Sequence, residues 1–140
     1  MLARLVVGAA LATVLTAPAA AQRPEIDPVA RAWLEAEVPI RWARMVEQGD
    51  SLFNNGTCRR CHGDGGVGGR RGPDLTDGEW AHGDGSLDAI FETIYWGVRK
   101  KDMVEQSRPF DMNPNGGMVI DWDLTRALAA YVWSLSHPSQ

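Results

Sequence analysis

Apolar residues recur at helical spacing along most of the chain. A short first helix is predicted over residues 27–37, because Asp27-Pro28 places proline at the first helical position. We expect the Val-Pro pair at residues 38–39 to interrupt it. Over residues 40–53 apolar or small side chains then fall at i, i+3, i+4, i+7, i+10 and i+11, as on one buried helix face. These side chains are Trp42, Met45, Val46, Gly49, Leu52 and Phe53.

Two further helices are predicted towards the C-terminus. Ser86 is a suitable N-cap for one of them, whose apolar side includes Ile90, Phe91 and Ile94 and which Gly97 ends. Asp121 is a suitable N-cap for the last helix, where apolar residues recur with the same period: Leu124, Ala127, Leu128, Tyr131, Val132 and Leu135. No segment alternates with period two for long enough to be a strand. The pattern therefore predicts an all-α protein.

The first 21 residues have the pattern of a secretory signal. A short start with one arginine precedes an apolar run over residues 5–17, and three alanines at residues 19–21 fit the small-residue cleavage rule. A membrane anchor is the alternative, but a spanning helix needs ~20 apolar residues and this run stops at Pro18. We expect cleavage after about Ala21, export to the periplasm, and no membrane span in the mature chain.

Length and charge leave room for one small domain. The chain has 140 residues and a net charge of −4, which becomes −5 when Arg4 is removed with the signal. This balance gives no indication of a nucleic-acid partner. We expect a signal at residues 1–21, an N-terminal extension with the start of the first core helix at residues 22–48, and one domain at residues 49–137.

The chain contains two cysteines, in the sequence Cys58-Arg59-Arg60-Cys61-His62. A disulfide between them is compatible with an oxidising compartment. A structural zinc site needs four ligands, and no second Cys/His pair follows. A thiol–disulfide catalyst has its motif beside a βαβ pattern, which is missing here. A histidine directly after the second cysteine instead favours covalent attachment of one haem c.

The spacing of this motif suits that chemistry. Thiols three positions apart lie on the same side of a helical turn, so Cys58 and Cys61 can add to two vinyl groups on one porphyrin edge. His62 then points beneath the ring as an iron ligand. The glycine-rich residues 63–68 formally match a dinucleotide fingerprint, but that fingerprint needs a preceding strand and a following helix. We expect a flexible loop there.

Residues 46–135 resemble the class I cytochrome c family. Four positions carry the resemblance at the two ends of the domain: Gly49, Phe53, Leu128 and Tyr131. In the family, the first two stand in the helix before the haem motif, and the last two form the Leu-x-x-Tyr of the closing helix. The resemblance implies that these helices cross closely at Gly49, around one covalent haem, with an extra N-terminal helical extension. Phe53 stands one residue further from Cys58 than in many members, which predicts a small loop around residues 54–56.

The family also has Gly-Pro-x-Leu after the haem motif, as in residues 72–75. By this resemblance, the carbonyl of Pro73 accepts a hydrogen bond from His62, which orients the imidazole and raises its basicity. Leu75 would lie on the porphyrin. Trp80 stands where relatives often pack an aromatic residue beside the haem propionates.

A methionine before the last helix supplies the second axial ligand in the family. Residues 112–117, Met-Asn-Pro-Asn-Gly-Gly, fit the family's Met-Pro-rich loop best, so the resemblance assigns Met112 to this role. Met103 follows a basic run and Met118 leads directly into the helix cap, so both fit less well. His82 is a further alternative, because it could form a bis-histidine site.

Basic residues gather near the haem motif and before the proposed ligand: Arg59, Arg60, Arg70, Arg71, Arg99, Lys100 and Lys101. Such runs are usually solvated surface. The alternative is a positive collar around the haem edge that steers an acidic partner. The remaining tryptophans are predicted to pack in the core or between helices: Trp33, Trp42, Trp96, Trp122 and Trp133. His137 is predicted to be a frayed terminal residue.

Three functional classes follow, in this order. The first is a free periplasmic carrier of single electrons, between a dehydrogenase or cytochrome donor and an oxidase or other acceptor. The second is a bound cytochrome subunit, because residues 72–80 and 130–135 look similar to cytochrome modules of terminal oxidases and quinoprotein dehydrogenases. The third is an enzyme such as a peroxidase, which needs a displaceable sixth ligand. Ligation by His62 and Met112 implies a raised potential and electron transfer without catalysis.

Overall fold

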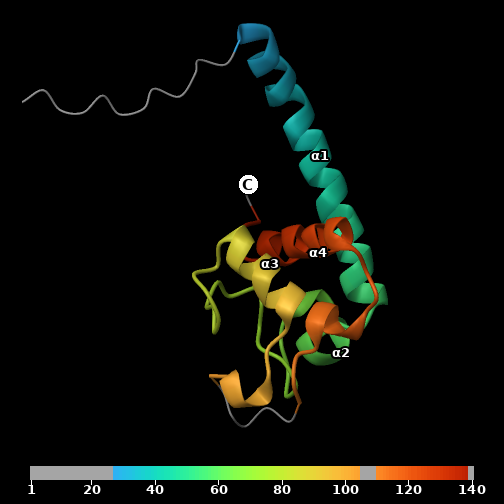
Figure 1. Ribbon diagram of the computed structural model, residues 1–140, viewed down its shortest axis with the longest axis vertical. Coiled ribbons are helices and arrows are strands. Elements are labelled where there is room, and N and C mark those ends of the chain that lie inside the picture. Colours follow the sequence, from blue (N-terminus) through green and yellow to red (C-terminus); the bar gives the residue numbers. More distant parts are fainter. Residues whose placement is uncertain (1–26, 105–109, 139–140) are drawn as a thin grey trace, which may run out of the picture.

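A computed structural model shows a helical protein, and it describes residues 27–104 and 110–138 (Figure 1). This part contains the helices α1 (Pro28–Asn55), α2 (Arg59–His62), α3 (Leu87–Trp96) and α4 (Trp122–Leu135). Short 3-10 turns lie between them: η1 (Asp64–Gly66), η2 (Lys100–Asp102) and η3 (Pro114–Gly117). The all-α prediction is confirmed. The signal predicted at residues 1–21 lies outside the described residues.

The helix starts follow the predicted caps. Asp27 Oδ1 accepts hydrogen bonds from the first amides of α1, Ser86 Oγ accepts one from Ala89 at 3.3 Å, and Asp121 Oδ1 accepts one from Leu124 at 2.9 Å. Each oxygen pairs an amide that the first helical turn leaves without a partner. These three boundaries of the sequence analysis are confirmed.

Two predicted breaks are absent or displaced. The interruption at residues 38–39 is wrong, because α1 continues through Pro39. A proline inside a helix leaves the carbonyl four positions earlier, here that of Glu35, without its donor, but Glu35 is exposed, so water can bond that group. The small loop predicted around residues 54–56 is also displaced. The helix ends at Asn55, and the connection to α2 is formed by residues 56–58.

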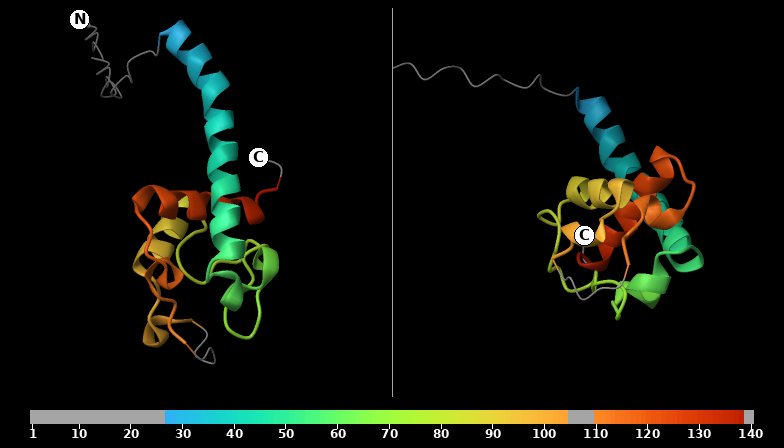
Figure 2. Two further views of the ribbon diagram at one scale, coloured as in Figure 1. Left: turned by 90° about the vertical axis from the view of Figure 1, so that its right-hand side faces the viewer. Right: turned by 60° about the horizontal axis from the view of Figure 1, so that its bottom comes forward.

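The helices α1 and α4 cross, and their contact builds the core (Figures 1 and 2). A Cβ atom on Gly49 would lie 2.6 Å from Tyr131 Cβ and would overlap the carbonyl oxygen of Ala127. The missing side chain therefore permits the close approach that the family resemblance implies. The core around this crossing consists of Phe53, Ile90, Ile94, Leu128, Ala129, Tyr131 and Val132.

The first half of α1 extends beyond this core (Figure 2). It exposes several apolar side chains, namely Val29, Trp33, Leu34, Val38 and Ile40. Within the described ranges, neither this helix nor any other combines the length and the apolar character needed to cross a bilayer.

The tryptophans divide into two groups. Trp42 and Trp133 pack edge to face, with ring centroids 5.5 Å apart, which confirms their predicted role between helices. The prediction is wrong for Trp33 and Trp96, which are exposed. Trp122 is also exposed, but its ring packs on Phe91 of α3 at 4.4 Å, so its predicted role between helices is confirmed. The prediction of a frayed His137 is also wrong. Its ring stacks on Trp133 at 4.0 Å between centroids.

Candidate cofactor site

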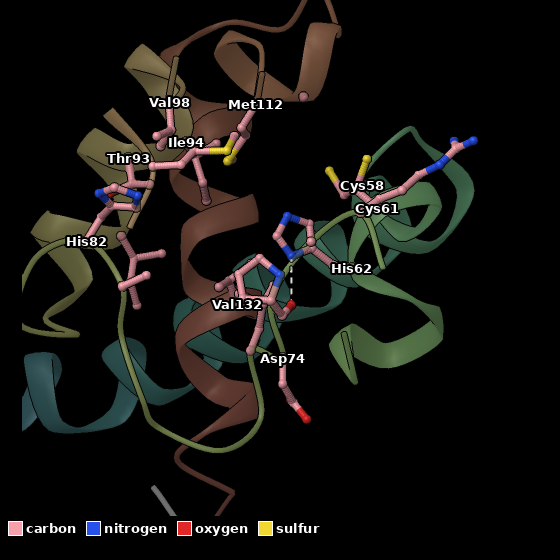
Figure 3. Close-up of a pocket in the computed structure, with 18 of the residues that line it drawn as sticks. Cys58, Cys61, His62, Asp74, His82, Thr93, Ile94, Val98, Met112 and Val132 are labelled. Carbon is pink, nitrogen blue, oxygen red and sulfur yellow. Dashed lines mark hydrogen bonds between the residues drawn. The ribbon is translucent and has the colours of Figure 1, made fainter. Parts of the chain in front are cut away.

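A cavity of about 530 Å³ lies beside the α1–α4 crossing, within the size range of ligand pockets (Figure 3). Its apolar walls come from all parts of the fold: Phe53, Leu75, Ile90, Ile94, Val98, Leu128 and Val132. Both cysteines, His62 and Met112 also line it. The structure therefore brings the predicted site residues together around one space.

The short helix α2 determines where the two cysteines lie. Cys58 directly precedes this helix, and the amide of Cys61 donates to the Cys58 carbonyl at 3.1 Å. This turn places both sulfur atoms along the same edge of the cavity (Figure 3). No disulfide joins the two cysteines in the described part of the chain. Burial raises the pKa of the Cys58 thiol to about 11, so this group is protonated at neutral pH.

His62 is 9% exposed, and its orientation is fixed by the chain itself. Its Nδ1 lies 3.1 Å from the carbonyl oxygen of Pro73. A carbonyl can only accept, so Nδ1 carries the proton and donates, which puts the lone pair of the neutral ring on Nε2. This is the tautomer in which a histidine can coordinate a metal through Nε2 while its other nitrogen is held by the protein.

The segment after α2 is packed tightly against the histidine. A Cβ atom on Gly72 would lie 3.0 Å from both the Cys61 carbonyl oxygen and His62 Cε1. The amide of Leu75 donates to the carbonyl of Gly66 at 2.8 Å, which holds the Leu75 side chain in the cavity wall. The missing side chain at Gly72 lets the backbone pass close to the imidazole of His62. The next residue then places the carbonyl of Pro73 within hydrogen-bonding distance of that ring.

Met112 lies across the cavity from His62 (Figure 3). Its backbone pairs with Val98 in an isolated antiparallel bridge, with both N–O distances at 2.8 Å. The next turn, η3, is joined to the cysteine motif, because Thr57 Oγ1 donates to the Gly116 carbonyl at 2.8 Å. These contacts hold the methionine loop against the rest of the site.

The other candidate ligands differ in position. Met103 and His82 also line the cavity, so the structure brings both to the same space as Met112. Met118 is not among the lining residues. Its sulfur lies 2.6 Å from where a Cβ of Gly56 would be, and the side chain packs against the core. Met118 therefore supports the loop that precedes α2.

Some residues of the site carry no signal in the sequence. Val98 fixes Met112 through two hydrogen bonds, but a bridge of one residue pair gives no period-two pattern. Thr57 and Thr93 also line the cavity and were not predicted. Trp80, which was predicted beside the cofactor, does line the cavity and packs closely against Gly85.

The basic residues near the motif are all exposed. Arg59 pairs with Asp64 at 3.3 Å and Arg99 with Asp102 at 2.8 Å, both at the surface. Arg71 lines the cavity and lies over the Phe110 ring, 5.5 Å from its centroid. Exposed ion pairs of this kind add little stability, and the carboxylates of Asp64 and Asp102 offset the positive charge of Arg59 and Arg99.

Residues 44–132 match the family model described as cytochrome C oxidase, cbb3-type, subunit III. The chain belongs to this family. Family membership makes it a class I c-type cytochrome module, an electron-transfer protein rather than an enzyme. The cysteine motif, the methionine loop and the crossing of α1 and α4 at Gly49 lie within the matched residues.

Individual relatives support the same family. The chain is 36% identical to the "Cbb3-type cytochrome c oxidase subunit FixP" of Rhizobium meliloti over 129 residues, which are 90% of this chain and 43% of that protein. It is 38% identical to the "Cbb3-type cytochrome c oxidase subunit CcoP" of Rubrivivax gelatinosus over 101 residues, 72% of this chain and 29% of that protein. The chain thus spans less than half the length of these relatives. No solved structure matches it significantly.

Proposed function

We propose that this chain carries one haem c and passes single electrons as a cytochrome subunit of a terminal oxidase complex, on the periplasmic side. The observation that supports the haem is the arrangement of the cavity. Two thiols lie along one edge, and a histidine with its Nδ1 proton donated to Pro73 faces the same space as Met112. Thioether bonds from Cys58 and Cys61, with axial ligands from His62 and Met112, fit these positions.

Haem supplies reversible one-electron chemistry when it is bound. The protein's part is to hold the group and to exclude water from it. Phe53 and Leu128 are both 1% exposed and form the inner wall, which gives a low-dielectric environment. If His62 and Met112 both held the iron, no coordination position would remain for a substrate. This argues against the peroxidase interpretation and supports a role in electron transfer.

The bound subunit is preferred over the free carrier, which reverses the order proposed from the sequence alone. The relatives named above are all described as oxidase subunits, and the chain aligns with them over most of its length. A donor upstream and the oxidase downstream would then be its redox partners. Export through residues 1–21 would place the module in the periplasm, where c-type haem proteins and oxidising conditions occur together.

The decisive experiment is maturation in cells that contain the machinery for covalent haem attachment. We expect one haem per chain by mass spectrometry and a haem stain that survives a denaturing gel. The Cys58→Ala/Cys61→Ala variant should lose the covalent stain. Wild-type chain found only as bare polypeptide would contradict the proposal. Co-purification with an oxidase complex then separates the bound subunit from the free carrier.

A further inference from the structure

A group of aromatic side chains reaches the surface on α3 and at the start of α4: Trp96 and Trp122 are exposed, and Phe91 and Tyr95 are half-buried. We call it the aromatic patch, and it consists of Phe91, Tyr95, Trp96 and Trp122. The solvent reaches 72% of Trp96 and 53% of Trp122. Large apolar side chains that gather at the surface mark interaction sites in soluble proteins. The cofactor site uses none of these four residues.

The patch is separate from the lining of the cavity. Ile90 and Ile94 line the cavity and are buried, whereas Phe91, Tyr95 and Trp96 are not among its lining residues. A partner on the patch would be separated from the cavity by one helix. A helix with its side chains is roughly 10–12 Å across, so such a partner would lie close to the cofactor without covering the cavity.

Ring contacts between α3 and α4 hold the patch in place. The Trp122 centroid lies 4.4 Å from that of Phe91 and 5.3 Å from that of Tyr95. Tyr95 in turn contacts Trp96 edge to face at 4.9 Å. Side chains that are already ordered lose little entropy when a partner binds. Tryptophan and tyrosine are also the residues that contribute most to binding energy in protein interfaces.

Exposed carboxylates surround the patch: Asp88, Glu92, Asp121 and Asp123. The first two are one helical turn apart on α3, each three positions before an aromatic member of the patch, and the other two flank Trp122 in the chain. This rim has the opposite sign to the basic residues around the cysteine motif.

Few cations neutralise the rim. Arg126, one turn after Trp122, is the one basic residue within α3 or α4. Arg99 follows Trp96 by three positions, but its Nε is bonded to Asp102 Oδ2 at 2.8 Å. The patch therefore combines a rigid apolar centre with a negative edge, which is complementary to a positive surface.

We infer that the aromatic patch is a docking surface for a second protein, which presents lysine or arginine side chains around an apolar recess that receives Trp96 and Trp122. Nucleic acid and anionic lipid surfaces have the wrong sign for this rim. The partner's place in an oxidase complex rests on the proposed function; the chemistry of the surface does not. Docking here would leave the basic residues near the motif available to an acidic partner.

Carbodiimide cross-linking tests the chemistry of the rim directly. The reagent activates a carboxylate, and a neighbouring lysine amine displaces the activating group to form an amide bond. The haem-loaded chain would be treated together with a cbb3-type oxidase complex purified from the same cells without this chain. We expect cross-links from Asp88, Glu92, Asp121 or Asp123 to lysines of another subunit. Cross-links from the rim to a second copy of this chain alone would overturn the inference.

Tryptophan variants test the apolar centre. We expect Trp96→Ala/Trp122→Ala to weaken binding to the purified complex by about tenfold or more, as loss of central interface anchors does. Trp33→Ala is the matched control, because Trp33 is also 53% exposed but lies on α1. It should bind like wild type, and all variants should keep the haem spectrum. Equal binding by the double variant would refute the docking surface alone, whereas failure of wild type to bind the complex would refute the subunit role.

Discussion

Asn54 donates a hydrogen bond from Nδ2 to the hydroxyl oxygen of Tyr131 at 3.0 Å, across 77 positions of sequence. The same side chain accepts a bond from the amide of Gly65 at 3.2 Å. One asparagine at the end of α1 therefore joins the closing helix to the loop that follows the cysteine motif. Asn54 can make both bonds because α1 continues to Asn55. The sequence analysis had predicted a loop at these residues.

Removal of the Tyr131 hydroxyl should lower the free energy of unfolding. We expect Tyr131→Phe to lose about 1 kcal/mol, the typical net value of one hydrogen bond, in denaturant titrations of the haem-loaded protein. Tyr95→Phe is the matched control, because no hydrogen bond of its hydroxyl is seen in the described part of the chain. An equal loss in both variants would show that the bond to Asn54 contributes nothing.

The same tyrosine should make stability depend on alkaline pH. Burial raises the pKa of Tyr131 above its usual value near 10, although the hydrogen bond from Asn54 acts in the opposite direction. In the unfolded chain Tyr131 therefore loses its proton at lower pH than in the folded one. The free energy of unfolding should fall as pH rises through about 10. Tyr131→Phe should show a smaller fall, and an unchanged pH profile would contradict this assignment.

The helix crossing should tolerate no side chain at Gly49. We expect Gly49→Ala to destabilise the protein by about 1–3 kcal/mol or more, because the new methyl group meets backbone atoms of α4. Gly69→Ala is a suitable control, since its nearest contact would be the Cys61 carbonyl oxygen at an ordinary 3.8 Å. Thermal unfolding followed at the haem absorbance measures both. Equal thermal midpoints for the two variants would mean that α1 and α4 can move apart at Gly49 without lowering the stability of the protein.

Ligand substitution should identify the residue opposite His62. A ferric haem with a thioether ligand has a weak far-red band, and thioether ligation raises the reduction potential. We expect Met112→Ala to lose this band and to lower the potential. Met118→Ala should retain both, because Met118 lies outside the cavity. If Met112→Ala keeps the band, the same measurement on Met103→Ala would test the other methionine of the cavity; if wild type has no such band, His82 is the candidate to test.

The basic residues near the cysteine motif should attract an acidic redox partner through long-range electrostatics. If they steer an acidic partner, the rate of electron transfer should fall as salt is added, because ions screen the attraction. Arg60→Glu and Lys101→Glu should lower the rate at low salt and flatten the salt dependence. A wild-type rate that is constant from low to high salt would instead show that these charges are only solvated surface.

Local signals predicted much of this structure. Ser86 and Asp121 cap the helices that they were expected to cap, because a cap depends on a few neighbouring amides. Gly49 also lies where the family pattern requires a close approach. The pairing of Val98 with Met112 could not be predicted from local sequence signals. It joins two loops through a single residue pair, which leaves no periodic pattern in the sequence.

Exposure was harder to predict than helicity. Trp96 and Trp122 were expected in the core or between helices because their side chains are large and apolar. An apolar side chain at helical spacing requires a covering surface, but the pattern does not say whether that surface belongs to the same chain. The exposed tryptophans show where the chain supplies none.

The projecting half of α1 acts as a rigid spacer. Residues 28–40 are helical and largely exposed, and at 1.5 Å per residue this stretch is roughly 20 Å long. A partner that held the chain near Pro28 would therefore set the height of the proposed haem above the point of contact. Electron tunnelling falls steeply with distance, so shortening this rod by one or two turns would change which donors the cofactor can reach.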